Sequence, residues 1–119
     1  MKKTIVLGAT PNPSRYAYHA VQRMIENGIE VFPIGIRAGE IMGTKILIGK
    51  PSLSAIHTVT LYLNPHNQRE YYDYIIFLKP KRIIFNPGAE NFELMQLAKR
   101  AGIETQVECT LVMLSVGSY

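Results

Sequence analysis

Short apolar runs recur along the chain, and stretches in which apolar positions follow a helical period separate them. β-Branched and other apolar side chains dominate these runs, as in strands buried on both faces of a sheet. Strands are therefore predicted at residues 4–7, 30–34, 57–63, 82–85 and 104–107, with a shorter strand within residues 45–48.

Helices are predicted between the strands from capping residues. The first covers residues 14–27, with Ser14 as its N-cap and Gly28 as its C-terminal stop. Another follows Asn91, which can cap it, and ends at Gly102.

A further helix is predicted from Asn64 and Pro65, because a capping side chain there precedes a proline in the first turn. Pro80 ends it. Residues 35–55 are rich in glycine and are expected to be irregular. Residues 111–114 form an apolar end piece that is expected to pack on the sheet.

Strands that alternate with helices indicate parallel β-α-β units, and right-handed crossovers place helices on both faces of the sheet. The predicted fold class is α/β: one Rossmann-like, doubly wound domain over residues 1–119 with a mostly parallel sheet. In that topology the strands at 4–7 and 57–63 are neighbours, and the crevice between their carboxyl ends is the expected ligand site.

Composition narrows the function classes. The chain has 119 residues, 47% hydrophobic and 18% charged, with a net charge of +4. The basic residues are spread thinly, so an anionic small molecule explains the excess better than a nucleic acid does. The apolar runs are too short for a membrane span or a signal peptide, and a cytoplasmic location is expected.

The loop after the first strand carries the candidate chemistry. Gly8 allows close approach to the backbone, Thr10, Asn12 and Ser14 offer polar groups, and Arg15 adds a fixed charge. A helix N-terminus directly behind such a loop favours phosphate. The alternative is a β–α turn with an ordinary N-cap and no ligand.

The loop differs from the dinucleotide fingerprint. Prolines stand where G-x-G-x-x-G has its later glycines, and the second strand is not followed by the acid that holds the ribose of NAD. Arg37 follows that strand instead. It suits an additional phosphate, or it is a solvated loop charge.

The chain resembles the small bacterial CoA-binding proteins, which are Rossmann-like domains similar to the CoA-binding domain of the succinyl-CoA synthetase α subunit. The resemblance covers almost the whole chain. It rests on the opening loop and on five later segments: Val31-Phe32-Pro33-Ile34, Glu40-Ile41-Met42-Gly43, Pro51-Ser52-Leu53, Asn86-Pro87-Gly88-Ala89-Glu90-Asn91 and Glu108-Cys109-Thr110-Leu111.

This resemblance implies coenzyme A or acyl-CoA as the ligand and implies where it lies. The pyrophosphate would contact the opening loop, whose implied site residues are Gly8, Ala9, Thr10, Asn12, Ser14 and Arg15. The adenine and ribose phosphate would lie toward the end of the second strand and the segment after the strand at 57–63, and the pantetheine arm toward the turn after the strand at 82–85. The implied residues outside the opening loop are Pro33, Ile34, Arg37, Asn64, Pro65, Asn86, Pro87 and Gly88.

Other reactive residues are expected to be structural. Cys109 is the single cysteine, and the apolar residues after it predict a buried, non-catalytic thiol. His19, His57 and His66 share no metal-ligand spacing, so no metal site is predicted.

Three functions remain open at this point. The first is a regulatory or accessory CoA-binding module without catalysis of its own, acting with a protein partner or as a homo-oligomer. The second is an enzyme that uses NAD(P) or another adenine nucleotide in the same crevice. The third is a structural subunit whose ligand site is vestigial.

Overall fold

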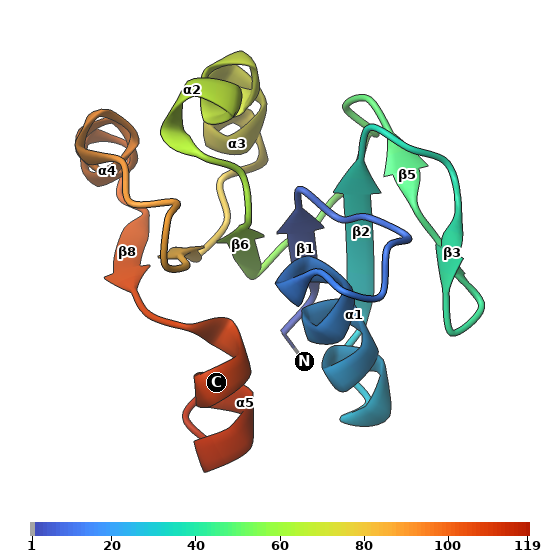
Figure 1. Ribbon diagram of the computed structural model, residues 1–119. Coiled ribbons are helices and arrows are strands. Elements are labelled where there is room, and N and C mark those ends of the chain that lie inside the picture. Colours follow the sequence, from blue (N-terminus) through green and yellow to red (C-terminus); the bar gives the residue numbers. More distant parts are fainter. Residues whose placement is uncertain (1) are drawn as a thin grey trace.

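The computed structural model describes residues 2–119 and shows a parallel sheet between two layers of helices (Figure 1). The strand order is β5-β2-β1-β6-β7-β8, and every pairing in this six-stranded sheet is parallel. The strands are β1 (Thr4–Leu7), β2 (Val31–Gly35), β5 (Leu47–Ile48), β6 (Thr58–Leu61), β7 (Arg82–Phe85) and β8 (Glu104–Val107). The predicted α/β fold class is confirmed.

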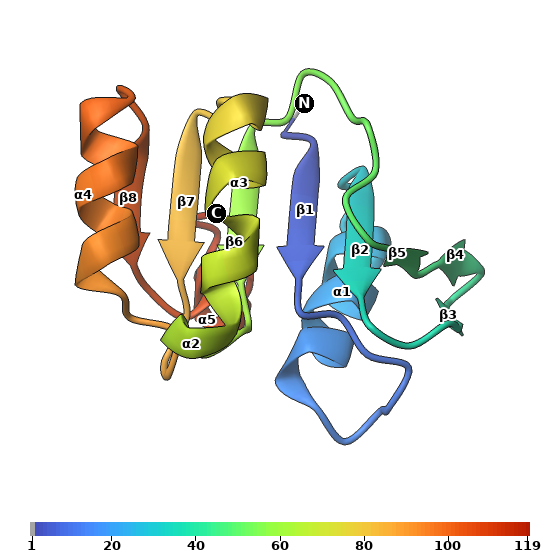
Figure 2. The ribbon, with the colours of Figure 1, turned by 90° about the horizontal axis from the view of Figure 1, so that it is seen from above.

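Helices cover both faces of the sheet. In Figure 2, α4 and α3 lie in front of the strands, and α1 and α5 lie behind them. The helices are α1 (Tyr16–Glu26), α2 (Pro65–Gln68), the 3-10 helix η1 (Arg69–Tyr71), α3 (Tyr72–Leu78), α4 (Phe92–Arg100) and α5 (Thr110–Val116).

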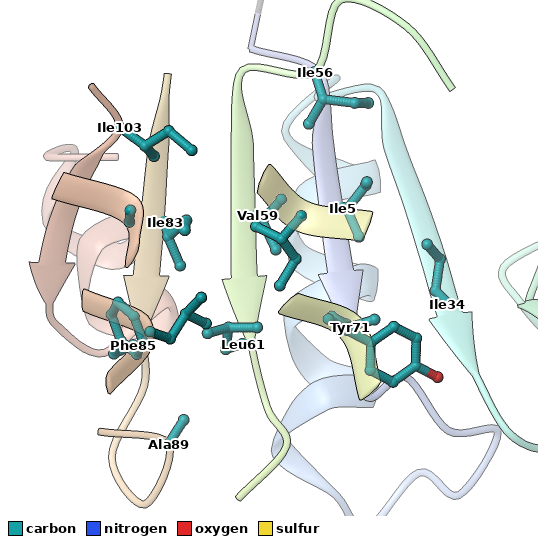
Figure 3. Packing of buried hydrophobic residues seen from close by; sticks show 14 residues of the cluster. Ile5, Ile34, Ile56, Val59, Leu61, Tyr71, Ile83, Phe85, Ala89 and Ile103 are labelled. Atoms are coloured by element: carbon teal, nitrogen blue, oxygen red, sulfur yellow. The ribbon is translucent and has the colours of Figure 1, made fainter. Parts of the chain in front are cut away.

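Side chains alternate between the two faces along each strand and so build two cores. Ile5 and Leu7 of β1 pack in the cluster under α3 and α4, whereas Val6 packs against α1. Figure 3 shows the first cluster, in which Leu61 of β6 and Phe85 of β7 lie side by side. The sheet is therefore apolar on both faces, as a doubly wound fold requires.

Several predicted elements differ from those observed. The helix expected from Ser14 begins at Tyr16, and Arg15 is its N-cap residue, with no side-chain capping bond. The strand expected at 57–63 is shorter, because β6 spans Thr58–Leu61. The helix expected after Asn64 is divided into α2, η1 and α3.

The segment expected to be irregular contains the antiparallel pair β3 (Glu40–Ile41) and β4 (Thr44–Lys45), followed by β5. The strand expected within 45–48 is interrupted at Ile46, which is buried. The apolar end piece is helical: it forms most of α5, which packs against α1. A short continuous apolar run is compatible with either a helix or a strand, so the sequence pattern does not decide between them and packing in the folded chain does.

Candidate functional site

A cleft of about 800 Å³ opens at the carboxyl edge of the sheet. Within the sheet, β2 and β5 lie on one side of β1, and β6, β7 and β8 lie on its other side, so the direction in which strands are added reverses at β1. Ligands bind at such a reversal in α/β sheets, because the loops from the two halves diverge there. Figure 2 shows the strand arrowheads pointing to this edge, where the β1–α1 loop and α2 lie.

The β1–α1 loop is held tightly against the end of β2. The N–H groups of Gly8 and Ala9 both donate to the Ile34 carbonyl at 2.9 Å. Gly8 has φ +102°, a conformation that glycine adopts without strain. A Cβ on Gly35 would lie 2.1 Å from the Ala9 carbonyl oxygen, so the contact requires glycine there too.

Hydrogen bonds within the loop organise its polar side chains. Asn12 Oδ1 accepts from Ser14 N–H at 3.0 Å and from Ser14 Oγ–H at 2.8 Å, which forms an Asx-type turn. Thr10 Oγ1 accepts from Asn12 N–H at 3.2 Å. The Thr10 hydroxyl hydrogen and the Asn12 NH2 group remain as donors for a ligand.

The N-terminus of α1 presents positive potential to the cleft. Within residues 2–119, the N–H groups of Tyr16 and Ala17 donate to no other residue, as expected at a helix start. The first turn of α1 has no acidic residue. The Arg15 side chain is exposed and lines the cleft beside these N–H groups. A phosphate fits this end of the cleft.

Arg37 and the segment after β6 line the cleft on the two sides of β1. Arg37 is exposed just beyond β2 and lines the cleft. Asn64 caps α2, where its Oδ1 accepts from Asn67 N–H at 2.9 Å. Glu70 adds one carboxylate to the lining of the cleft.

Two tyrosines at the cleft stay neutral over the physiological pH range. Burial raises the pKa of Tyr71, and the nearby Glu70 carboxylate raises it further. Burial also raises the pKa of Tyr62. The Tyr62 hydroxyl has no hydrogen-bond partner within the described residues. Both side chains therefore act as neutral groups beside the charged arginines.

The structure brings most of the residues expected from the sequence to this cleft. Ten of them line it: Gly8, Ala9, Thr10, Asn12, Arg15, Ile34, Arg37, Asn64, Pro87 and Gly88.

Four expected residues do not line the cleft. The Ser14 hydroxyl is engaged with Asn12, Pro33 is buried within β2, and Pro65 occupies the first turn of α2. Asn86 is buried, with its Nδ2 2.7 Å from Thr60 Oγ1 and 2.8 Å from the Leu61 carbonyl, and its Oδ1 accepts from Thr110 N–H. It joins strands and α5 instead of facing a ligand.

The cleft also has lining residues that sequence reasoning did not select: Tyr16, Ala17, Gly35, Ile36, Tyr62, Asn67, Glu70, Tyr71 and Ala89. Gly35 could have been selected, because a glycine directly after the predicted strand 30–34 allows a close approach to the backbone. The others are ordinary strand, helix or loop residues, and nothing in their local pattern distinguishes them.

Cys109 lies at the N-cap position of α5 and is half-buried, so the expectation of a buried thiol is wrong.

Among residues 2–119, no three His, Cys, Asp or Glu side chains gather closely enough to hold a metal ion. In the same part of the chain, no helix combines the length and apolar character that a bilayer crossing needs.

Comparison with protein families identifies the relatives of this fold and cleft. A family described as a CoA binding domain matches residues 2–115, which include every segment that lines the cleft. The chain belongs to this family. The resemblance found in the sequence is thereby confirmed, and this CoA-binding domain has no significant match among curated proteins.

Solved structures show the same fold. A crystal structure described as an uncharacterized protein is 51% identical, with a TM-score of 0.97, over 100% of this chain and 98% of that one. A hypothetical protein from Pyrococcus horikoshii OT3 is 27% identical, with a TM-score of 0.84, over 97% of this chain and 82% of the other. A protein from Thermus thermophilus, 21% identical with a TM-score of 0.86, covers 99% of this CoA-binding domain and 90% of its own chain and shares the fold.

Proposed function

We propose that the cleft binds coenzyme A or an acyl-CoA, and that the protein is a regulatory or accessory module without catalysis of its own. One observation carries the proposal. In a chain of the CoA-binding domain family, the free N–H groups at the start of α1 and the exposed Arg15 and Arg37 line one cleft at the carboxyl edge of the sheet. Coenzyme A has separated phosphates, which suit separated positive groups.

The ligand is proposed to run along the edge of the sheet. The pyrophosphate would lie against the β1–α1 loop, near Gly8, Thr10 and Arg15. The adenosine and its phosphate would lie toward the end of β2 and Arg37, and the pantetheine arm toward Gly88 after β7. This path follows the residues of the cleft and the order in which the loops occur along it.

The chemistry of the lining supports binding without catalysis. Within residues 2–119, Glu70 is the one carboxylate that lines the cleft, and Cys109 and the histidines lie elsewhere. A nucleophile and a general base within hydrogen-bond reach would be needed for acyl transfer. We therefore propose that the module acts in the cytoplasm through a protein partner or as a homo-oligomer.

Calorimetric titration with CoA, acetyl-CoA, NAD, NADP and ATP tests the proposal. CoA or acetyl-CoA is expected to bind most tightly, since the position after β2 carries no acid for a ribose diol. At about a hundred times its dissociation constant the ligand should add about 2.7 kcal/mol to the unfolding free energy. Tighter binding of NAD or NADP would favour the enzyme alternative, and no binding of any of these compounds would favour a vestigial site.

A further inference from the structure

The side-chain amide of Gln68 is buried behind one wall of the cleft. Gln68 ends α2, and its side chain is inaccessible to solvent. Its Nε2 donates to the carbonyl oxygens of Leu63 and Ala89, each at 2.8 Å. Leu63 follows β6, Ala89 follows β7, and both line the cleft. One amide group therefore joins the two loops that form this wall.

The partners of Gln68 determine which way its amide points. Carbonyl oxygens only accept hydrogen bonds, so the NH2 group must face Leu63 and Ala89. Gln68 Oε1 accepts from Asn91 Nδ2 at 2.8 Å. Asn91 is also buried, and its Oδ1 accepts from Leu94 N–H at 3.2 Å at the start of α4. A flip of either amide would set donor against donor, so the arrangement has one stable orientation.

The bonds made by Gln68 also orient two peptide groups. In a trans peptide the C=O and the following N–H point in opposite directions. The carbonyls of Leu63 and Ala89 point toward Gln68, so the N–H groups of Asn64 and Glu90 point away from it. Within residues 2–119, neither of these N–H groups donates a hydrogen bond to another residue.

We infer that Gln68 is a positioning residue for ligand binding, which aims the Asn64 and Glu90 N–H groups at acceptor oxygens of the bound ligand. The inference rests on the proposed function and adds donors from the loops after β6 and β7, on the side of β1 away from β2. The ligand oxygens concerned are the amide carbonyls of the pantetheine arm. Because β6 lies between β1 and β7, an arm that runs from the β1–α1 loop to Gly88 passes the segment after β6, which the resemblance had assigned to the adenosine. With both carbonyls held by Gln68, no carbonyl oxygen of these peptides repels the acceptors of the arm.

Amide NMR spectra of the wild-type protein test this directly. CoA is expected to shift the Asn64 and Glu90 amide signals and to slow their hydrogen exchange. Adenosine 3′,5′-bisphosphate, which lacks the pantetheine arm, should shift the Tyr16 and Ala17 signals and leave Asn64 and Glu90 unchanged. CoA shifts at Tyr16 and Ala17 without shifts at Asn64 and Glu90 would overturn the inference and leave the proposed function standing. No CoA-induced shift anywhere would overturn both.

Variants of Gln68 provide a second test. Gln68→Met keeps the length of the side chain and removes its donors, so CoA affinity should fall on the order of tenfold. Affinity for adenosine 3′,5′-bisphosphate should stay close to that of the wild type. Equal losses for the two ligands would mean that Gln68 only supports the fold, and no loss for CoA would also reject the positioning role.

A pH profile and a control separate this effect from destabilisation. The carboxyl of Gln68→Glu regains one donor when it is protonated, so its CoA affinity relative to wild type should rise as the pH falls. Ile103→Ala removes buried contacts at the opposite edge of the sheet from Ala89 (Figure 3). It should lower stability without changing the ratio of the two affinities. A flat relative pH profile, or the same ratio change in Ile103→Ala, would contradict the inference.

Discussion

Arg15 contributes to the cleft separately through its backbone and its side chain. Its N–H donates to the Asn12 carbonyl at 3.2 Å, and its own carbonyl accepts from Tyr18 and His19 at the start of α1. Its side chain makes no capping bond and is exposed in the cleft. A substitution at this residue can therefore remove the charge and preserve the helix start.

Arg15→Ala is expected to weaken CoA binding by about 1.5–3 kcal/mol, the range for a hydrogen bond to a charged group. Calorimetric titration measures the loss, and urea unfolding should show nearly unchanged stability. Arg23→Ala, in the last turn of α1, is the matched control because Arg23 does not line the cleft. Unchanged CoA affinity in Arg15→Ala would exclude this side chain from the site.

Cys109→Ser is expected to leave CoA affinity unchanged and to alter stability by less than about 1 kcal/mol. Cys109 occupies the N-cap position of α5, where serine is a preferred residue, and it does not line the cleft. Titration and urea unfolding measure the two quantities. A stoichiometric mixed disulfide with Cys109, detected by mass spectrometry after incubation with oxidised CoA, would instead show a redox role.

The junction between β2 and the β1–α1 loop is the element on which the phosphate end of the cleft depends. The backbones of Gly8, Ala9 and Gly35 pack closely there, with no side chain between them. The loop holds its shape because the end of β2 supplies the Ile34 carbonyl at the same place.

Gly35→Ala tests this junction. Its Cβ would meet the Ala9 carbonyl at 2.1 Å, a backbone atom that can move away only if the loop shifts. The unfolding free energy is expected to fall by about 1–3 kcal/mol, as for other overpacked sites. CoA affinity should fall as well, because the displaced loop carries the phosphate donors. Urea unfolding and titration measure these effects, and wild-type values for both would contradict the contact.

At the scale of the whole molecule, basic residues surround His57 at the amino edge of the sheet. His57 precedes β6, and its Nδ1 lies 2.7 Å from Thr58 Oγ1. Burial lowers the pKa of His57 below its ordinary value of 6.5, and nearby Arg82, Lys2 and Lys81 lower it further. Protonation of His57 therefore favours the unfolded chain.

This shift has a defined sign in a stability profile. Above pH 6.5 His57 is neutral in both the folded and the unfolded chain and does not lower the unfolding free energy. As the pH falls from 6.5 toward the lowered pKa of the folded state, the unfolded chain takes up the proton first and the unfolding free energy decreases. His57→Gln is expected to show a smaller loss of stability than the wild type between about pH 7 and about pH 5. Urea unfolding across this range is the measurement. Equal pH slopes in the two proteins would contradict the prediction.

Features that depend on neighbouring residues could be predicted from the sequence. The strand Thr4–Leu7 and the loop behind it were predicted because an apolar run, a glycine and polar residues follow one another directly. Asn64 was predicted as a helix cap and is one, since its Oδ1 needs only the N–H three residues later. The parallel order of the strands followed from the alternation of strands and helices.

The way in which distant segments meet has no local signal and is visible only in the folded chain. Asn86 follows a strand in a turn-like sequence and was expected in the site, but its amide is buried because Thr60, Leu61 and α5 offer it partners. Gln68 carries no local signal, and its role arises because the loops after β6 and β7 converge on it. Local pattern specifies backbone conformation, whereas burial and hydrogen-bond partners depend on residues far apart in the chain.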